Sequence, residues 1–133
     1  MRQGIRNLLG PKPLLGIAIA YTLLITAVLL TPITDPPKID IPFADKVVHL
    51  IINAGLFVVW GSYVFSGKTK TKTTKTYTLP LLFVCTLLYG ILIEVVQGRF
   101  IPTRGADFFD VVANVCGLIL GFFVVKLTKK FIY

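Results

Sequence analysis

Charged residues are scarce in this chain of 133 residues: they make up 15% of it, against 55% hydrophobic residues, and the mean hydropathy is +0.81. A soluble domain normally carries about 25% charged residues, so an ordinary soluble domain is excluded. The net charge of +8 would suit a nucleic-acid-binding protein, but long apolar runs separate the basic residues. No solvated basic face is left for a duplex, so we expect no nucleic acid among the partners.

Histidine and cysteine are also rare, since the sequence holds only His49, Cys85 and Cys116 of these types. Neither cysteine has a histidine or a second cysteine at the spacing of metal ligands. We expect both cysteines to be small buried apolar residues inside the fold.

Four long runs contain no Lys or Arg, and each is close to the roughly 17–25 residues that a helix needs to cross a bilayer. They cover residues 14–30, 47–65, 79–96 and 108–125. None alternates in the manner of a barrel strand, and an open sheet would leave its edges unsatisfied in lipid. The first run lacks a small-x-small cleavage site, so it is predicted to remain as a span. The sequence therefore predicts an all-α, integral membrane four-helix bundle, with residues 1–133 as one domain.

The basic residues are distributed unevenly between the connections. The N-terminal arm, the loop Ser66 to Thr78 and the C-terminal tail together hold ten Lys and Arg and no acid. The opposite side holds four Lys and Arg and all six Asp and Glu. The positive-inside rule then predicts that both termini are cytoplasmic. The loop of lysines and threonines is predicted to be a flexible connection near anionic lipid head groups.

Three ionisable side chains fall inside the predicted spans near the outer side, and groups of this kind are costly unless they serve a function. His49, Glu94 and Asp110 are therefore the candidate catalytic residues. Helical spacing places further polar residues beside them, because positions three or four apart share a helix face, and the loop between the third and fourth spans adds two arginines. These candidate binding residues are Asp45, Lys46, Asn53, Gln97, Arg99, Arg104, Asp107 and Asn114.

Several of these residues also have a structural interpretation. Asp45 and Asp107 each precede an apolar run and are predicted to cap a helix N-terminus. Asn53 and Asn114 are suited to hydrogen bonds between helices, whereas Glu94 has no capping position. The pair Gly117 and Gly121 forms a GxxxG motif, which permits either a close contact inside the bundle or a homo-oligomer interface.

The charges of the cluster leave two interpretations open. Four carboxylates (Asp45, Glu94, Asp107 and Asp110) are balanced by Lys46, Arg99 and Arg104 when His49 is protonated, so the set can neutralise itself. The alternative is a divalent metal such as Zn²⁺, Mn²⁺ or Mg²⁺, with His49, Glu94 and Asp110 as ligands. The spacing matches no recognised metal motif, and no other cofactor is indicated.

Three motifs in order resemble the VanZ-like family of small bacterial membrane proteins. They are Asp45-Lys46-x-x-His49, Glu94-x-x-Gln97 and Arg104-x-x-Asp107-x-x-Asp110-x-x-x-Asn114-x-x-Gly117. The resemblance covers about residues 41–125 and implies a multi-pass protein of the bacterial cytoplasmic membrane. The family takes its name from a member associated with resistance to the glycopeptide teicoplanin, so antibiotic resistance is implied by analogy only.

Two functions are consistent with these residues. In the first, an outward-facing site binds or acts on membrane lipids or lipid-linked envelope precursors: arginines hold a phosphate or carboxylate, and His49 or Glu94 serves as general base or acid. In the second, the polar cluster is not catalytic but holds the helices together, and the outer surface binds a partner, a lipid or a glycopeptide. Ion or proton translocation is a third interpretation, although four short spans leave little room for a pathway.

Overall fold

The computed structural model describes residues 10–32, 42–66, 72–103 and 105–132, and no strand occurs in these ranges. Four helices account for almost all of them: α2 (Pro11–Leu30), α3 (Ala44–Ser66), α4 (Lys72–Phe100) and α5 (Phe108–Ile132). Each contains one of the four predicted apolar runs. All four are long and apolar enough to cross a membrane. The prediction of an all-α membrane four-helix bundle is confirmed.

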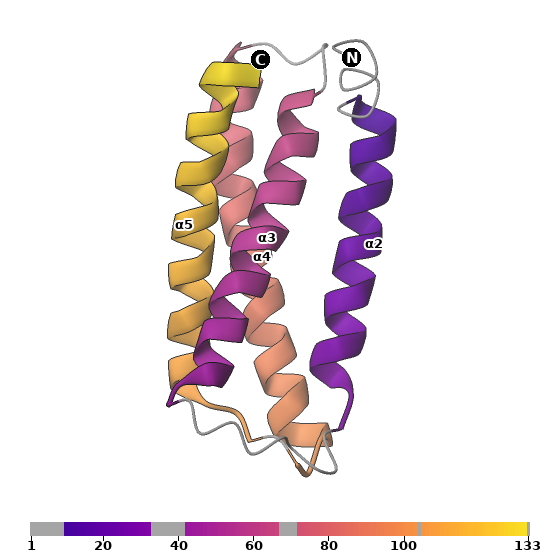
Figure 1. The fold of residues 1–133 in the computed structure, drawn as a ribbon, viewed down its shortest axis with the longest axis vertical. Helices are drawn as coiled ribbons and strands as arrows, with labels where there is room; N and C mark the ends of the chain where they lie inside the picture. The colour runs from indigo at the N-terminus through magenta and orange to yellow at the C-terminus, as the bar shows by residue number, and fades with distance from the viewer. Residues whose placement is uncertain (1–9, 33–41, 67–71, 104, 133) are drawn as a thin grey trace.

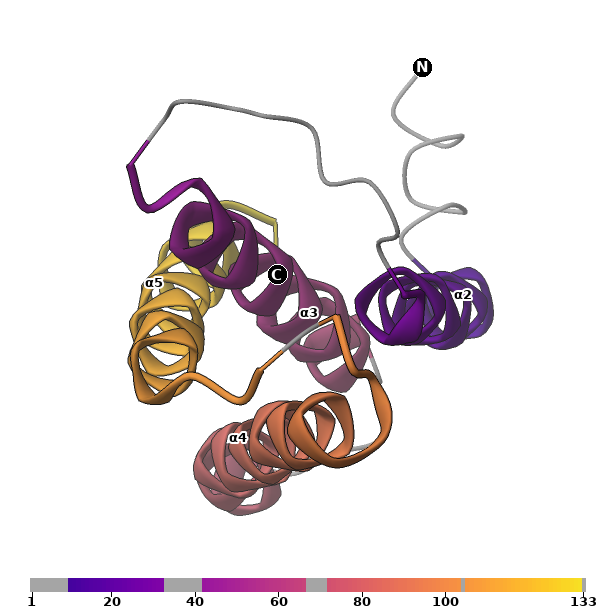
Figure 2. The same ribbon diagram turned by 90° about the horizontal axis from the view of Figure 1, so that it is seen from below.

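The helices run up and down in chain order, so the beginning of α2 and the end of α5 lie at the same end of the bundle (Figure 1). Seen along the bundle, α3 lies between α2, α4 and α5 (Figure 2). Its most extensive contact is with α5. This topology brings the first turns of α3 and α5 to the same end of the bundle as the last turns of α4.

Glycines allow α5 to approach α3 closely. A Cβ atom at Gly117 would meet the backbone carbonyl of Leu50, and one at Gly121 would lie 2.8 Å from the Ala54 carbonyl oxygen. The GxxxG motif is therefore used within the bundle. Next to this contact, α3, α4 and α5 form an apolar core. Its buried residues are Phe57, Phe65, Leu79, Leu118 and Val125.

Helix α2 is joined to the other helices by hydrogen bonds of Tyr, Thr and Trp side chains. The Tyr21 hydroxyl donates to the Ile52 carbonyl at 3.0 Å, and the Trp60 indole N–H donates to the Thr22 hydroxyl at 3.0 Å. The Thr26 and Tyr89 hydroxyls lie 2.7 Å apart and share a hydrogen bond. The sequence motifs gave no indication of these bonds, because isolated Thr, Tyr and Trp residues in apolar runs carry no spacing signal.

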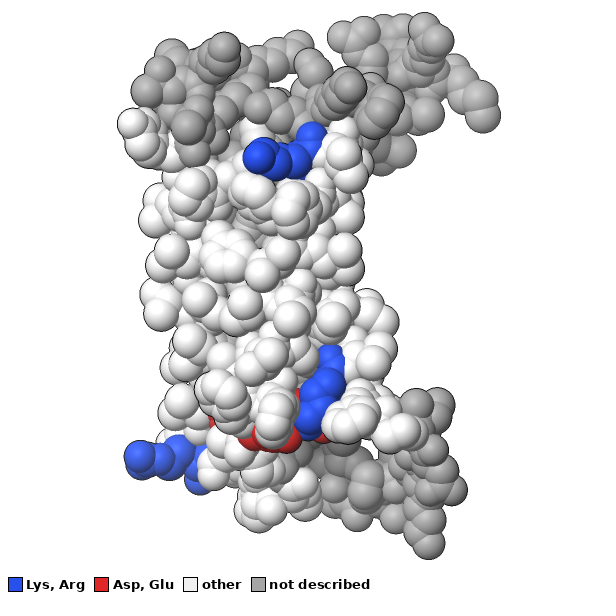
Figure 3. Space-filling view, turned by 90° about the vertical axis from the view of Figure 1, so that its left-hand side faces the viewer, with Lys and Arg blue, Asp and Glu red and all other residues white. Residues whose placement is uncertain are grey.

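The outer surface of the helices is apolar. Large side chains such as Leu23, Leu24 and Leu88 are about 60% exposed or more, which is the arrangement expected of residues facing lipid tails. In Figure 3, an uncharged band separates acidic and basic side chains at one end from basic side chains near the other. Cys85 and Cys116 also lie on this surface. Their predicted burial was wrong, because a sulfur-containing apolar side chain is as compatible with lipid as with a protein core.

Helix α4 begins earlier than its apolar run. Of the loop predicted from Ser66 to Thr78, residues 67–71 lie outside the described part, and residues from Lys72 onward are helical. The prediction of a flexible connection is therefore wrong for its second half. No Gly or Pro occurs between Lys72 and Leu79 to end a helix, and Pro80 is accommodated inside it.

Candidate functional site

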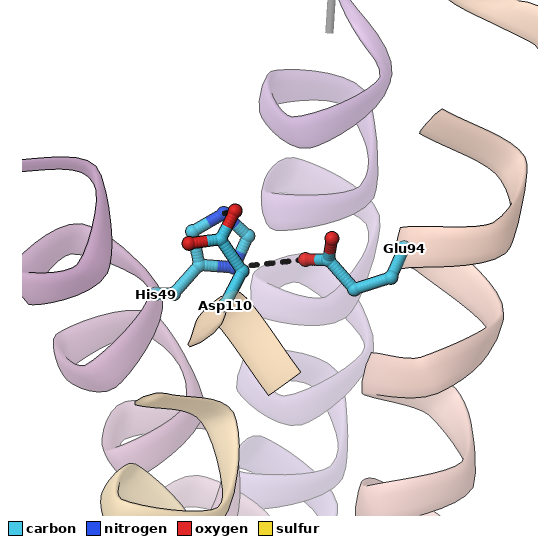
Figure 4. Close-up of side chains that lie close together, drawn as sticks. All are labelled: His49, Glu94 and Asp110. Atoms are coloured by element: carbon cyan, nitrogen blue, oxygen red, sulfur yellow. Dashed lines mark ion pairs between the residues drawn. The ribbon is translucent and has the colours of Figure 1, made fainter. Parts of the chain in front are cut away.

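Three ionisable side chains from three helices meet inside one end of the bundle (Figure 4). His49 comes from α3, Glu94 from α4 and Asp110 from α5, and all three are buried. His49 Nδ1 lies 3.3 Å from Glu94 Oε1, and His49 Nε2 lies 4.0 Å from Asp110 Oδ2. The predicted position of all three side chains near the same side of the membrane therefore corresponds to a real cluster, in which the imidazole lies between two carboxylates.

A pair of buried amides lies one turn deeper. Asn53 donates through Nδ2 to Asn114 Oδ1 at 2.6 Å and to the His49 carbonyl at 2.9 Å. The same Asn114 oxygen lies 3.2 Å from His49 Nδ1. Gly90 of α4 leaves room for both amides, since a Cβ there would come within 3.2 Å of Asn114. The amides thus fix the imidazole ring and link α3 to α5.

Lys46 joins the acidic side chains at the outer edge of the cluster. Its Nζ contacts Asp45 and Asp107 at 2.6 Å each and Asp110 at 3.0 Å. The carboxylate of Asp107 also accepts the Phe109 N–H at 2.9 Å, so its predicted capping of α5 is confirmed. The Lys46 hydrogen bond and, next, the Phe109 amide hold the pKa of the Asp107 carboxyl below its usual range.

Asp45 does not cap a helix. Helix α3 begins at Ala44, so Asp45 lies inside the first turn, where a negative charge still interacts favourably with the helix dipole. The preceding Phe43 adopts a φ of 64° and accepts the first hydrogen bond of the helix, from Val47, through its carbonyl. The apolar run starts later than the helix, so the sequence placed the N-terminus two residues too late: Asp45 as the cap would make Lys46 the first helical residue, and α3 begins at Ala44.

Gln97 attaches the end of α2 to the site. Its buried Nε2 donates to the Leu29 carbonyl at 2.7 Å, which satisfies one of the last carbonyls of α2. The sequence indicated Gln97 as a site residue through its spacing from Glu94. Its partner was not predictable, because nothing in the first apolar run distinguishes Leu29 from its neighbours.

A cavity of about 680 Å³ opens beside these residues. Its polar lining includes His49 and the carboxylates of Asp45, Asp107 and Asp110, and its apolar lining includes Val28 and Val48. The complete lining is Val28, Leu29, Asp45, Val48, His49, Gln97, Gly105, Ala106, Asp107 and Asp110. Glu94 is not among these residues and lies behind His49.

Neither of the two arginines predicted to bind a ligand is found in the cavity lining of the described residues. Arg99 is exposed at the end of α4 and does not line the cavity. Arg104 lies outside the described residues. Within the described part of the chain, Lys46 is the one Lys or Arg that pairs with the carboxylates.

Three buried acceptor atoms have no hydrogen-bond donor among the described residues. They are both carboxylate oxygens of Glu94 and Oδ1 of Asn53. The 3.3 Å approach of His49 to Glu94 is an ion pair without the alignment of a hydrogen bond. Buried acceptors normally find a donor, so these atoms mark a place where a proton or a cation would be stabilised.

The site lies entirely within a region that matches a known family. Residues 18–129 match the VanZ/LLP1 family model. The chain belongs to the VanZ/LLP1 family. No curated protein and no solved structure shows significant similarity to it. As a VanZ/LLP1 protein with four membrane-length helices, the chain is a multi-pass membrane protein.

Proposed function

We propose that the cavity binds the polar head group of a lipid or lipid-linked cell-envelope molecule. The observation that carries this proposal is the composition of the cavity at one end of four membrane-length helices. Aliphatic side chains such as Val28 and Val48 form one part of its lining, and carboxylates with His49 form another. An amphiphile can contact both kinds of surface at once. Ligand sites are commonly built in this way, with a mostly apolar lining and a few polar groups that orient the ligand.

The chemistry of the lining favours a head group that donates hydrogen bonds. Carboxylates such as Asp45 and Asp107 accept hydrogen bonds and do not donate when ionised. An ammonium or a hydroxyl group complements them better than a bare phosphate, and Arg99 does not line the cavity. Phosphatidylethanolamine and amine-bearing or sugar-bearing envelope precursors have such groups.

His49 is the group placed to exchange a proton with the bound molecule. It lines the cavity together with Asp110, which approaches its Nε2, whereas Glu94 approaches its Nδ1 and does not line the cavity. In this proposal His49 is the general acid or base, and Glu94 is a positioning residue that fixes the ring from the Nδ1 side. By analogy with the family's teicoplanin-resistance member, altered susceptibility to glycopeptides is the expected cellular consequence.

Lipid binding can be tested with purified protein in nanodiscs containing equal amounts of phosphatidylethanolamine and phosphatidylglycerol. Native mass spectrometry should show about tenfold more bound phosphatidylethanolamine, since hydrogen bonds to charged groups contribute about 1.5–3 kcal/mol. Asp107→Asn should remove most of the preference. Thr86→Val is the matched control, because Thr86 is a buried polar residue of α4 outside the cavity. Equal binding of both lipids by the wild type would contradict the proposal.

We further propose that the cavity faces the outside of the bacterial cytoplasmic membrane and that both termini are cytoplasmic. The ten basic residues at the opposite end of the chain's spans support this orientation. A fluorescent protein fused after Tyr133 should fold and fluoresce, and alkaline phosphatase fused there should be inactive. The same two reporters inserted between α2 and α3 should give the reverse result. Active phosphatase after Tyr133 would show the opposite orientation.

A structural role is the second candidate, and the hydrogen bonds of Asn114 and the ion pairs of Lys46 favour it. These contacts join α3 to α5 without any ligand. If the role is only structural, Asp110→Asn should lower the melting temperature in detergent by several degrees while lipid preference stays unchanged. A lost preference in a variant that melts normally would favour the binding site instead.

A further inference from the structure

The ligand atoms of His49, Glu94 and Asp110 are close enough to share one ion. One nitrogen or oxygen from each residue lies within 4.8 Å of those of the other two. All three residues are buried, and each comes from a different helix. In Figure 4 the two carboxylates point toward the imidazole from α4 and α5. An imidazole with two carboxylates is a donor set that suits Zn²⁺ and Mn²⁺.

Distances around His49 Nδ1 also match the edges of a coordination polyhedron. Two ligands that are each about 2.05 Å from a tetrahedral ion lie about 3.3 Å apart. Nδ1 lies 3.3 Å from Glu94 Oε1 and 3.2 Å from Asn114 Oδ1. An ion in place of the Nδ1 proton would therefore find two oxygens at suitable spacing. Asp110 Oδ2 lies 4.0 Å from the other ring nitrogen, Nε2, and the side chain would turn toward the ion to complete the set.

The local charge and the missing donors favour an added proton or cation at this place. Lys46 faces Asp45, Asp107 and Asp110, and it does not pair with Glu94. No hydrogen bond from the described residues reaches either oxygen of Glu94, and its side chain is only 4% exposed. An isolated buried carboxylate is too costly to stay ionised without a partner. A single proton on His49 compensates one charge, whereas a divalent ion compensates two.

A second acidic group in the site is a poorer candidate. Asp45, Asp107 and Asp110 also bring their oxygens within 4.8 Å of one another. The ammonium of Lys46 already contacts all three carboxylates, and Asp45 is exposed. A cation there would have to displace the lysine, so the buried group with His49 is the stronger one.

We propose that His49, Glu94 and Asp110 bind one divalent transition-metal ion, with Zn²⁺ or Mn²⁺ as the chemical type and Asn114 Oδ1 as a further oxygen ligand. Mg²⁺ should bind much more weakly, because it prefers oxygen ligands and retains its water. The side chains of the three helices would bind this ion by themselves. It requires no bound lipid, so it goes beyond the head-group proposal and is tested without lipid ligands.

The first test is a zinc titration of purified protein in detergent, without an oligohistidine tag and stripped by a chelator. Competition with a chromophoric chelator should show one Zn²⁺ per chain. Glu94→Gln and Asp110→Asn should each weaken binding at least about 100-fold, more than the 10–100-fold typical of losing an outer-shell partner. Thr86→Val, at a buried polar residue of α4 outside the cluster, should leave the affinity within about threefold. A wild type that binds no Zn²⁺ or Mn²⁺, or a Glu94→Gln variant with unchanged affinity, would overturn the inference.

The second test needs no variant, so it cannot fail through misfolding. His49 is the sole histidine of the chain, and a ¹⁵N-histidine label therefore reports on one residue. Equimolar Zn²⁺ should shift its ring-nitrogen signals, and equimolar Mg²⁺ should not. Unchanged signals with Zn²⁺ would refute the site. Zinc binding in protein that shows no lipid preference would uphold this inference while the head-group proposal fails.

Discussion

Alanine at Gly117 is expected to cost the bundle about 2–3 kcal/mol and to lower its melting temperature by about 5–10 °C. The added methyl would enter the space of the Leu50 carbonyl and approach the Ala54 backbone nitrogen to 3.1 Å. Backbone atoms of α3 cannot rotate away as a side chain can, so the helices must separate. Thermal unfolding in detergent, followed by circular dichroism, measures the change.

Gly16→Ala is the matched control for this substitution. Gly16 lies inside α2, and a Cβ there would meet no atom within 4 Å. Alanine should therefore be neutral or stabilising by up to about 1 kcal/mol, because it favours helices over glycine. Equal melting of Gly117→Ala and the wild type would show that the contact between α3 and α5 is looser than the structure indicates.

Replacing Lys46 with methionine is the second large expected effect. The ammonium contacts three carboxylates, and its loss leaves the buried Asp110 without its closest cation. Breaking a buried ion pair costs about 3–5 kcal/mol, and exposed pairs contribute at most about 1 kcal/mol. Since Asp45 and Asp107 are partly exposed, we expect a loss of about 2–3 kcal/mol. Lys126→Met, in α5 at the other end of the bundle, should change stability little.

A double variant separates the charge from the packing of Lys46. Asp110→Asn should recover part of the stability lost in Lys46→Met, because the uncompensated carboxylate is then gone. Acid should reduce the difference between wild type and Lys46→Met. The pKa of Asp107 is lowered in the folded protein, so its pairing with Lys46 stabilises above the ordinary carboxyl range and is lost as the pH falls through the lowered pKa. A constant difference down to about pH 3 would contradict the ion-pair explanation.

The spacing of polar residues predicted much of this site, because helices repeat every three to four residues and the bilayer fixes their depth. His49 and Asn53 are four apart and are both buried on one face of α3, as expected. The same argument placed Asp110 and Asn114 on α5 opposite them. For residues on different helices, the spacing predicted only how deep each side chain lies in the membrane. The contact between His49 and Glu94 became visible only in the packed bundle.

Other features were beyond the sequence for identifiable reasons. The bonds from Gln97 to the Leu29 carbonyl and from Tyr21 to the Ile52 carbonyl involve backbone atoms, which every residue carries. The exposure of Cys85 could not be read from its apolar character, because lipid and protein interior attract the same side chains. Helix α4 extends past its apolar run because hydropathy marks a span and does not mark where a helix begins.

The amide pair has a consequence for how the protein is made. Asn53 and Asn114 are 61 residues apart, so α5 leaves the ribosome well after α3. At about 5–20 residues per second, the polar face of α3 waits roughly 3–12 s for its partner. During that time His49 and Asn53 must be shielded by the insertion machinery, by water or by a chaperone. A chain truncated before α5 would expose these groups to lipid and become a substrate for membrane quality control.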